Sequence, residues 1–433
     1  MAVGERNRAK ANQVTSDISG QEVNPSAFFI LLHTEPHEGF KPCATSRAKS
    51  QIFDAVVITC PQSKSVRELM QVSRQPSANN LEVPAAEPLV EVTRGAITES
   101  RHRGHVIAVE PNGRIVAQLG APETVTFLRS SAKPHQAIPL ITSGAADHFG
   151  FSESEVALAC ASHSGEPIHT KLAASMLRKI GLGPEALKCG IHEPFSPEET
   201  AKLRRAGEAP NVLQNNCSGK HAGMLALAVH LGAPVENYYE PGHPVQLAIG
   251  RVVSEFAAIP IEDISVGVDG CGVPVFGVTV KAMALMYARL VNPASNFDEP
   301  TRAACRRIVE AMTAHPEVIG GTTERLDTEM MRAAGGRLIS KVGAEGVYTV
   351  GVLPCEDWPN GFGLALKIED GDDHRARPTV VIESLRQLGV LADESLEAVA
   401  RYAFFPVKNR RGDVVGEVRA GFKLNVASQQ ADE

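Results

Sequence analysis

The stretch Phe127-Leu128-Arg129-Ser130-Ser131-Ala132-Lys133-Pro134 contains a serine that is followed three residues later by a lysine. On a helix, residues three apart share one face, so we expect the Lys133 amine to reach the Ser130 hydroxyl. A serine hydroxyl is a weak nucleophile, and a lysine kept neutral by burial or by a neighbouring cation can take its proton. Ser131 lies outside this register. The motif alone is weak, because Ser46-Arg47-Ala48-Lys49 also matches it.

Strand patterns lie at both ends of the region around this stretch, and helical patterns fill the middle. Residues 105–110 and 114–119 alternate like strands, and Pro111-Asn112-Gly113 predicts a hairpin between them. Ser152 and Glu155 form a capping box that opens a helix. Further strands are expected over 89–94, 264–268, 338–342, 347–353, 363–368 and 414–423, and helices over 168–180, 218–231, 244–256, 301–315 and 324–334. This order predicts an α+β fold, with one antiparallel sheet built from both chain ends and helices packed on it.

Two later segments extend the serine and lysine pattern. Ser162 follows a predicted helix, and Lys341 lies near the end of a predicted strand in Ser340-Lys341-Val342-Gly343. Penicillin-recognising enzymes have the same order of S-x-x-K, a second serine motif and a late K-[ST]-G. The chain resembles them, which implies a β-lactamase/penicillin-binding-protein-like fold. Ser162 does not begin an S-x-N motif, and Val342 stands where Ser or Thr is usual. These departures favour a relative with a substrate other than a β-lactam.

Four blocks of sequence make the resemblance more specific. They are Arg129-Ser130-Ser131-Ala132-Lys133-Pro134, Cys160-Ala161-Ser162-His163-Ser164-Gly165-Glu166, Asn215-Asn216-Cys217-Ser218-Gly219-Lys220-His221 and Val268-Asp269-Gly270-Cys271-Gly272. In this order they resemble the signature segments of the L-asparaginases of the Rhizobium etli type, the asparaginase II family of serine amidohydrolases. The resemblance covers roughly the last 340 residues. It implies two serine–lysine pairs, Ser130 with Lys133 and Ser162 with Lys341, and a homodimer.

The resemblance also implies one zinc ion held by Cys217, Lys220 and Cys271. Spacing alone is weaker evidence, because isolated cysteines are often simply buried and zinc prefers Cys, His and carboxylate ligands. A lysine binds a metal only when it is deprotonated. We therefore expect the metal to tune the substrate pocket rather than to activate the attacking water.

The activity implied is hydrolysis of L-asparagine to L-aspartate and ammonia through an ester on Ser130. Ser162 and Lys341 are expected to relay protons and to polarise the developing oxyanion. For substrate binding we expect either Arg129 or Arg325 at the α-carboxylate, because arginine binds carboxylates with two parallel hydrogen bonds. His221 and Asp269 flank the predicted metal ligands and are expected to support the same pocket.

Other functions of the same fold stay open from the sequence. The alternatives are a glutaminase, a penicillin-binding peptidase or β-lactamase, and a catalytically inactive amino-acid-binding relative. His163 and His169 have no evident third partner for a metal site, so we expect them to be structural. The glycine-rich segment 320–325 lacks the phosphate-binding P-loop pattern, and no dinucleotide fingerprint follows a strand, so no organic cofactor is expected.

Composition limits the class of protein. A formal net charge of −7 argues against nucleic-acid binding, which usually needs a basic face. Eight cysteines without a C-x-x-C pair favour reduced thiols over a disulfide framework. No run approaches the roughly 20 apolar residues of a membrane span, and no secretory signal is evident. We expect a cytoplasmic enzyme with a small-molecule substrate and no membrane partner.

The first 88 residues differ from the rest, because they are polar and have no sustained periodicity. We expect residues 1–88 to be disordered, or to be an extension ahead of the true start, and residues 89–433 to form the catalytic domain.

Overall fold

The computed structural model describes residues 85–427. The predictions for residues 1–84 lie outside this range, and the first strand begins at Glu87, two residues before the predicted domain boundary. No helix between residues 85 and 427 is both long enough and apolar enough to cross a bilayer.

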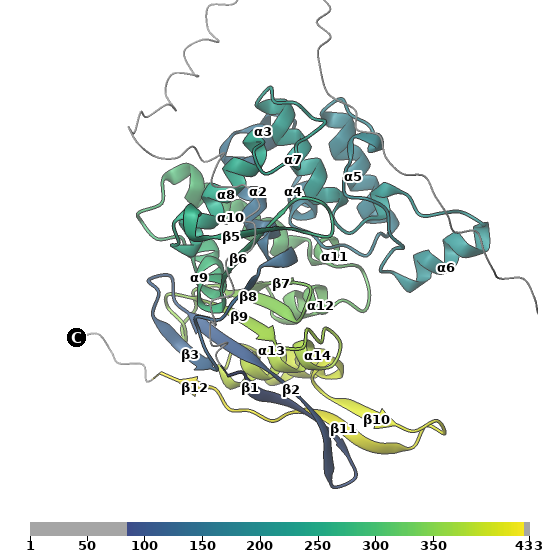
Figure 1. Ribbon diagram of the computed structural model, residues 1–433, viewed down its shortest axis with the longest axis vertical. Coiled ribbons are helices and arrows are strands. Elements are labelled where there is room, and N and C mark those ends of the chain that lie inside the picture. The colour runs from purple at the N-terminus through teal and green to yellow at the C-terminus, as the bar shows by residue number, and fades with distance from the viewer. Residues whose placement is uncertain (1–84, 428–433) are drawn as a thin grey trace, which may run out of the picture. The chain divides into compact units, whose positions relative to one another are not determined.

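The central element is a sheet in which every pair of neighbouring strands is antiparallel. Its order is β10-β11-β1-β2-β9-β8-β7, with β3 paired to β2 and β12 paired to β3. Early strands lie between late ones (Figure 1), so the predicted α+β class and the sheet built from both chain ends are confirmed. The strands are β1 Glu87–Arg94, β2 Ile97–Val109, β3 Ile115–Leu119, β7 Leu338–Val342, β8 Val347–Val352, β9 Phe362–Ile368, β10 Phe405–Lys408, β11 Val414–Ala420 and β12 Asn425–Val426.

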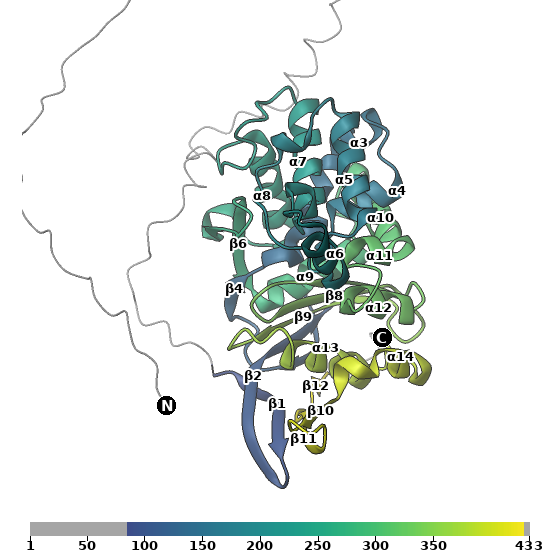
Figure 2. The ribbon, with the colours of Figure 1, turned by 90° about the vertical axis from the view of Figure 1, so that its right-hand side faces the viewer.

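Helices cover the middle of this sheet on both faces. Figure 2 shows helix α9 (Val280–Val291) and helix α13 (Ala376–Gln387) on either side of β9, and β8 is buried along its whole length. Gly363 explains the close approach of α9, since a Cβ at this position would lie 1.8 Å from the Ala284 carbonyl oxygen. Only glycine fits there.

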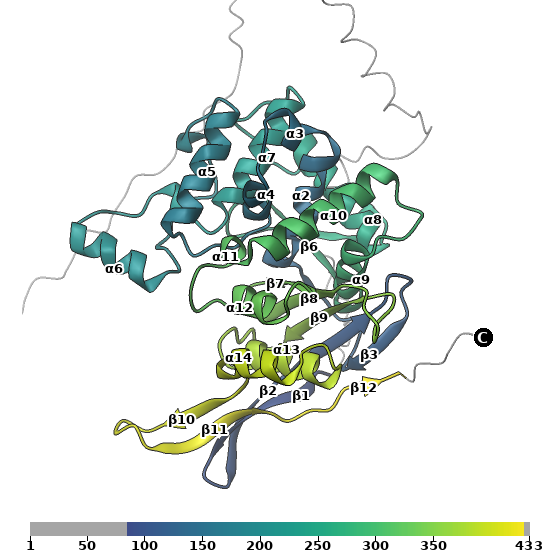
Figure 3. The ribbon, with the colours of Figure 1, turned by 180° about the vertical axis from the view of Figure 1, so that it is seen from behind.

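A helical region packs beyond α9, with a small second sheet of order β4-β6-β5 (Figure 3). The small sheet is formed by β4 Val125–Phe127, β5 Ser265–Val268 and β6 Pro274–Thr279. The remaining helices are α2 Lys133–Thr142, α3 Ala145–His148, α4 Glu153–Ala159, α5 Pro167–Lys179, α6 Pro197–Ala206, α7 Ser218–His230, α8 Pro244–Ala257, α10 Glu299–Ala314, α11 Pro316–Ile319, α12 Leu326–Ala333 and α14 Asp393–Ala403. Short 3-10 turns occupy Arg129–Ala132, Pro184–Ala186, Val212–Gln214 and Ile261–Asp263.

Local sequence signals account for several element ends. Ser152 Oγ accepts the Glu155 backbone N–H, and the Glu155 carboxylate accepts that of Ser152, so the predicted capping box is present. Gly113 has φ 91° in the turn between β2 and β3, and its N–H donates to the Glu110 carbonyl. The left-handed φ matches the glycine that the hairpin signal requires.

Several features of the fold were not predicted, among them the helices α6, α9, α13 and α14 and the strands β4, β6 and β10. Helix α9 is buried on nearly all sides, so it lacks the polar stripe that reveals an amphipathic helix. The α-helix expected to open near Ser130 instead begins at Lys133, after a 3-10 turn over Arg129–Ala132. Arg129 has φ 51°, a left-handed conformation that interrupts the entry to the helix.

Candidate active site

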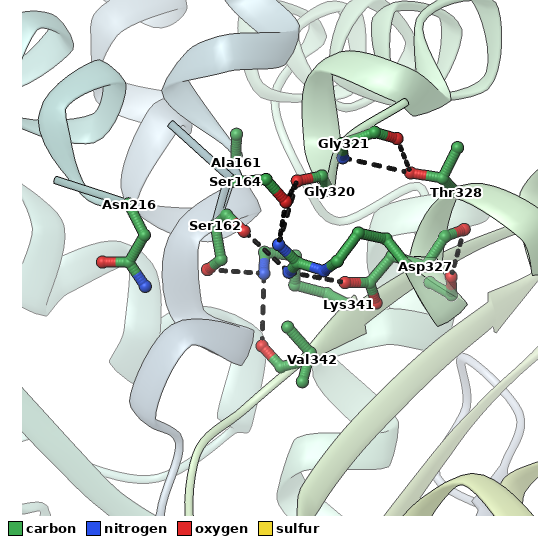
Figure 4. A network of polar contacts seen from close by, with 12 residues as sticks. Ala161, Ser162, Ser164, Asn216, Gly320, Gly321, Asp327, Thr328, Lys341 and Val342 are labelled. Carbon is green, nitrogen blue, oxygen red and sulfur yellow. Dashed lines mark hydrogen bonds and ion pairs between the residues drawn. The ribbon is translucent and has the colours of Figure 1, made fainter. Parts of the chain in front are cut away.

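One serine hydroxyl lies between two lysine amines from distant parts of the chain. Ser162 Oγ is 2.9 Å from Lys133 Nζ, at the start of α2, and 2.8 Å from Lys341 Nζ, on β7. Figure 4 shows Lys341 beside Ser162, in the loop that follows α4. All three side chains are at most 2% exposed. A hydroxyl held between two amines can pass a proton from one to the other.

Ser130 is placed differently from the sequence-based expectation. Lys133 Nζ donates to the carbonyls of Ala161 (2.6 Å) and Asn216 (3.2 Å) as well as contacting Ser162. Within residues 85–427 no hydrogen bond joins Ser130 Oγ to Lys133. Ser130 instead lines a cavity that also reaches Ser162. Ser162, Lys133 and Lys341 therefore form one connected group, and Ser130 lines the same cavity as Ser162.

Burial changes the protonation of both lysines. Removal from water, partly offset by Asp327 and reinforced by Lys133 and Arg325, lowers the pKa of Lys341 to about 7. Burial likewise lowers the pKa of Lys133, against the attraction of Cys217. Desolvation disfavours the charged form of an amine. Near neutral pH a substantial fraction of Lys341 is therefore an uncharged proton acceptor.

The cavity around these groups has a volume of about 640 Å³. Ser130 and Ser162 line it, together with residues of the loop before α6, the loop before α12, the turn after β7, and the segments around α13 and α14. The other lining residues are Phe195, Asn216, Glu324, Arg325, Leu326, Val342, Gly343, Ala344, Asp373, His374, Arg377, Pro378, Tyr402 and Phe405. The cavity is large enough for a small polar substrate.

Arg325 fixes the loop that carries Ser162. Its Nη2 donates to the Ser162 carbonyl at 2.8 Å, and its Nη1 donates to Ser164 Oγ at 2.8 Å and to the Gly320 carbonyl at 2.9 Å. Ser162 N–H also donates to the Ile319 carbonyl. These bonds join the loop of Ser162 to the segment 319–325 and so hold the Ser162 hydroxyl between the two lysines.

Arg129 and Asp269 brace the other side of the site. Arg129 Nε donates to Asp269 Oδ1 at 2.9 Å, and the backbone N–H of Leu128 donates to the Phe276 carbonyl on β6. Burial raises the pKa of Asp269, but Lys220 and Arg129 outweigh this and keep it below its usual value. The carboxylate therefore stays charged and holds the segment before Ser130 against the small sheet.

Cys217, Lys220 and Cys271 converge behind the cavity and are buried. Lys220 Nζ donates to Cys271 Sγ at 2.9 Å. The hydrogen bond from Cys271 lowers the pKa of Cys217 well below its usual value, against the effect of burial. Burial lowers the pKa of Lys220, but Cys271, Cys217 and Asp269 outweigh this and raise it above its usual value, so the amine is protonated and donates to the sulfur. Thiolate sulfurs are ligands that zinc accepts, whereas Lys220 would have to lose its proton before it could bind a metal. Between residues 85 and 427, no group of three or more His, Cys, Asp or Glu side chains is arranged so that it could hold a metal ion. A metal bound by Cys217 and Cys271 would therefore need Lys220 as its third protein ligand.

The four predicted substrate-binding residues differ in whether they line the cavity. Arg325 lines the cavity, whereas Arg129 and Asp269 pair with each other beside it. His221 is fully buried, and its Nδ1 lies 2.6 Å from Tyr238 Oη. The structure thus places His221 in the packing under the Cys217 segment, outside the cavity lining.

Sequence reasoning missed several residues of the cavity wall. Asp373, His374 and Arg377 lie just before or at the start of α13, and Tyr402 and Phe405 come from the last 40 residues. The only local signal was the charged segment 372–377, which resembles many solvated helix starts. It has no motif spacing that points to a ligand.

Searches of solved structures and curated proteins gave limited results. A probable glutaminase from Bacillus subtilis complexed with 6-diazo-5-oxo-L-norleucine is 13% identical, with 66% of this chain and 85% of that chain covered and a TM-score of 0.32. A Bacillus glutaminase in 4.3 M NaCl is 14% identical, with 66% and 91% covered and a TM-score of 0.31. We draw no conclusion from likenesses at this level. No curated protein matches the chain.

One family model matches about three quarters of the chain. The L-asparaginase II family matches residues 90–420, a span that contains both serines, all three lysines and both cysteines described above. This span runs from β1 to the end of β11, so it includes nearly the whole central sheet. The chain therefore belongs to the L-asparaginase II family and is an amidohydrolase.

Proposed function

We propose that this protein hydrolyses L-asparagine to L-aspartate and ammonia through an ester on a serine. The observation that supports this best is the Ser162 hydroxyl between the amines of Lys133 and Lys341 in the lining of a cavity. Amide hydrolysis needs a nucleophile and a base that is neutral near the working pH. Buried lysines meet the second requirement, and the serines meet the first.

In the first step, Ser130 Oγ attacks the side-chain amide carbon of asparagine. Ser130 is the more accessible of the two serines, whereas Ser162 is 2% exposed and is already held by two amines. Lys133, three residues along the chain, takes the Ser130 proton, which requires its amine to exchange the hydrogen bond to the Ala161 or Asn216 carbonyl for one from Ser130. Ser162 passes a proton on to Lys341, so that the positive charge can move along the group. The relay then returns a proton to the amide nitrogen, whose bond to carbon breaks as ammonia leaves.

In the second step, water attacks the aspartyl ester and gives its proton to the same relay. Aspartate leaves, and Ser130 recovers its hydroxyl. A lysine ammonium beside the cavity stabilises the oxyanion that develops in both steps. The relay has to be reversible, which suits Lys341 because its pKa of about 7 lies near neutral pH.

A zinc ion bound by Cys217, Lys220 and Cys271 is part of the proposal. When bound, the ion would supply a fixed positive charge and would crosslink the segments that carry these residues. Cys217 follows Asn216, whose carbonyl accepts from Lys133, and Cys271 is two residues from Asp269, which holds Arg129. The three side chains therefore connect both walls of the site, which supports a role in shaping the pocket.

The experiment that tests this function measures ammonia release from L-asparagine and L-glutamine, and the absorbance change on ring opening of a chromogenic β-lactam. We expect asparagine to have the highest kcat/KM and the β-lactam to be inert. Higher kcat/KM on glutamine would make the protein a glutaminase, and hydrolysis of none of the three would favour an inactive binder.

A second experiment tests the nucleophile. A diazoketone analogue of asparagine should label one serine, which peptide mass spectrometry identifies. We expect the label on Ser130 and its loss in Ser130→Ala. A label on Ser162 would instead make Ser162 the nucleophile, with the two lysines acting on it directly.

A further inference from the structure

Two arginines line the cavity, and one of them, Arg377, has no role in the proposed mechanism. The other, Arg325, has both of its amino groups hydrogen-bonded, to two carbonyls and one hydroxyl. Arg129 is bound to Asp269 and lies outside the cavity lining. Arg325 is thereby committed to holding the loop of Ser162, and Arg129 to holding Asp269.

Arg377, on the first turn of α13, has a free pair of parallel N–H donors of the kind that binds a carboxylate. Its Nη1 donates to the Gly343 carbonyl at 2.8 Å and to Asp373 Oδ1, which anchors one end of the guanidinium. Its Nε is buried and has no partner within the described residues, and no hydrogen bond from Nη2 is found there either. A buried N–H without an acceptor destabilises the protein. A carboxylate bound to this edge would supply the missing acceptor.

Asp373 offers the complementary charge. Its Oδ1 accepts from the Gly346 N–H at 2.8 Å and from Arg377. Among the described residues no donor is found on its Oδ2, and the side chain is about one-third exposed at the cavity wall. The carboxylate is therefore held in place by one oxygen, while the other is available to an ammonium group. An i, i+4 ion pair on a helix is common, but this one faces a cavity and leaves one polar edge on each partner unused.

The pair lines the same cavity as Ser130 and Ser162 and is tied to the Lys341 segment through Gly343. Gly343, which anchors Arg377, is two residues after Lys341, so their Cα atoms are at most about 7.6 Å apart. Lys341 in turn contacts Ser162 at 2.8 Å. A four-carbon amino-acid amide has its amide carbon and its α-carbon two bonds apart. Groups on adjacent parts of one cavity wall can therefore reach both ends of such a molecule.

We propose that Arg377 binds the α-carboxylate and Asp373 the α-ammonium of the substrate, which restricts the enzyme to free α-amino-acid amides. The inference rests on the proposed amide hydrolysis, and it assigns recognition of the amino-acid end to residues distinct from the serine and lysine group. Arg325 is then a positioning residue for Ser162.

Three amides separate the two contacts. L-Asparagine has both charged groups, succinamate lacks the α-amino group, and 3-aminopropanamide lacks the α-carboxylate. Arg377→Met should lower kcat/KM roughly 10- to 100-fold for asparagine and succinamate, since charged hydrogen bonds are lost. It should leave 3-aminopropanamide nearly unchanged. Asp373→Asn should lower the values for asparagine and 3-aminopropanamide and spare succinamate.

Arg375→Met is the matched control, because Arg375 is exposed, lies two residues before Arg377 and is not part of the cavity lining. It should change none of the three values. An equal loss on all three amides in Arg377→Met, or no loss on any, would overturn the assignment. Thermal melts of each variant show whether an equal loss comes from misfolding, and Arg377→Lys, which keeps the charge but not the fork, should recover only part of the asparagine activity.

Calorimetric binding of L-aspartate separates this inference from the proposed function. If the wild-type protein hydrolyses none of the amides, the proposed function fails, but weaker aspartate binding by about 10-fold or more in Arg377→Met would still support the subsite. Equal binding by wild type, Arg377→Met and Asp373→Asn would refute it whatever the activity.

Discussion

Replacing Lys341 with methionine should stabilise the protein, and by more at low pH than at high pH. Lys341 is fully buried, and its pKa falls from 10.5 in the unfolded chain to about 7 in the folded protein. Between these values the unfolded chain binds a proton that the folded chain does not. The free energy of unfolding therefore rises with pH across this window, and below pH 7 the full penalty for the buried amine is present.

The size of the effect follows from the shift. One pKa unit corresponds to about 1.4 kcal/mol, so the penalty below pH 7 reaches about 5 kcal/mol and disappears above pH 10.5. Methionine fills a similar volume without a charge. Relative to wild type, the variant should gain up to about 5 kcal/mol more at pH 6 than at pH 10.5.

Urea unfolding of both proteins at several pH values, with equal metal content, measures this difference. Lys171→Met, at an exposed site on α5, serves as the control and should show a difference from wild type that does not vary with pH. A Lys341→Met difference that is constant from pH 6 to pH 10 would refute the reasoning. So would one that grows with increasing pH, since the sign of the linkage would then be reversed.

Further predictions concern activity, metal and assembly. Asparaginase kcat/KM should rise through about pH 7 and then level, because Lys341 acts when neutral; a pH-independent rate would exclude this. Ser130→Ala should lower kcat at least roughly 1,000-fold, while Ser131→Ala, out of the cavity, should cost less than roughly 10-fold; the reverse order would refute the assignment. Elemental analysis should find about one zinc per chain, lost in Cys217→Ser, and finding none in chelator-free protein would remove the metal from the proposal. Light scattering should give the mass of a dimer, and a monomer at micromolar concentration would contradict the homodimer.

Several parts of the fold and site could be predicted because they depend on residues close together in sequence. The turn at Pro111-Asn112-Gly113 and the capping box at Ser152 are local backbone chemistry, and both are present. The strand patterns over 338–342 and 347–353 match β7 and β8 within one residue, because a short run rich in apolar and β-branched residues is visible in a short window. The order of strands and helices was sufficient for the α+β class.

Local sequence patterns did not predict a helix that is buried on most sides, or a hydrogen-bond partner that is distant in sequence. Helix α9 has apolar residues on most of its surface, because it lies between the sheet and other helices, so no polar face marked it. The i, i+3 spacing of Ser130 and Lys133 suggested a hydrogen bond between neighbours on one helix. The left-handed Arg129 and the 3-10 turn alter that geometry, and Lys133 contacts Ser162 instead.

The serines, lysines and thiols of the site stand in blocks that can be recognised before any fold is known. Their combination depends on contacts that form only in the folded chain. Ser162 and Lys341 are 179 residues apart, yet their polar atoms are 2.8 Å apart, and Arg377 gained a place in the cavity wall through the Gly343 carbonyl. Burial, which shifts the pKa of Lys341 to about 7, is also a property of the packed core. A lysine in a short peptide has no such environment, so its usefulness as a base arises only when the sheet and the helices close around it.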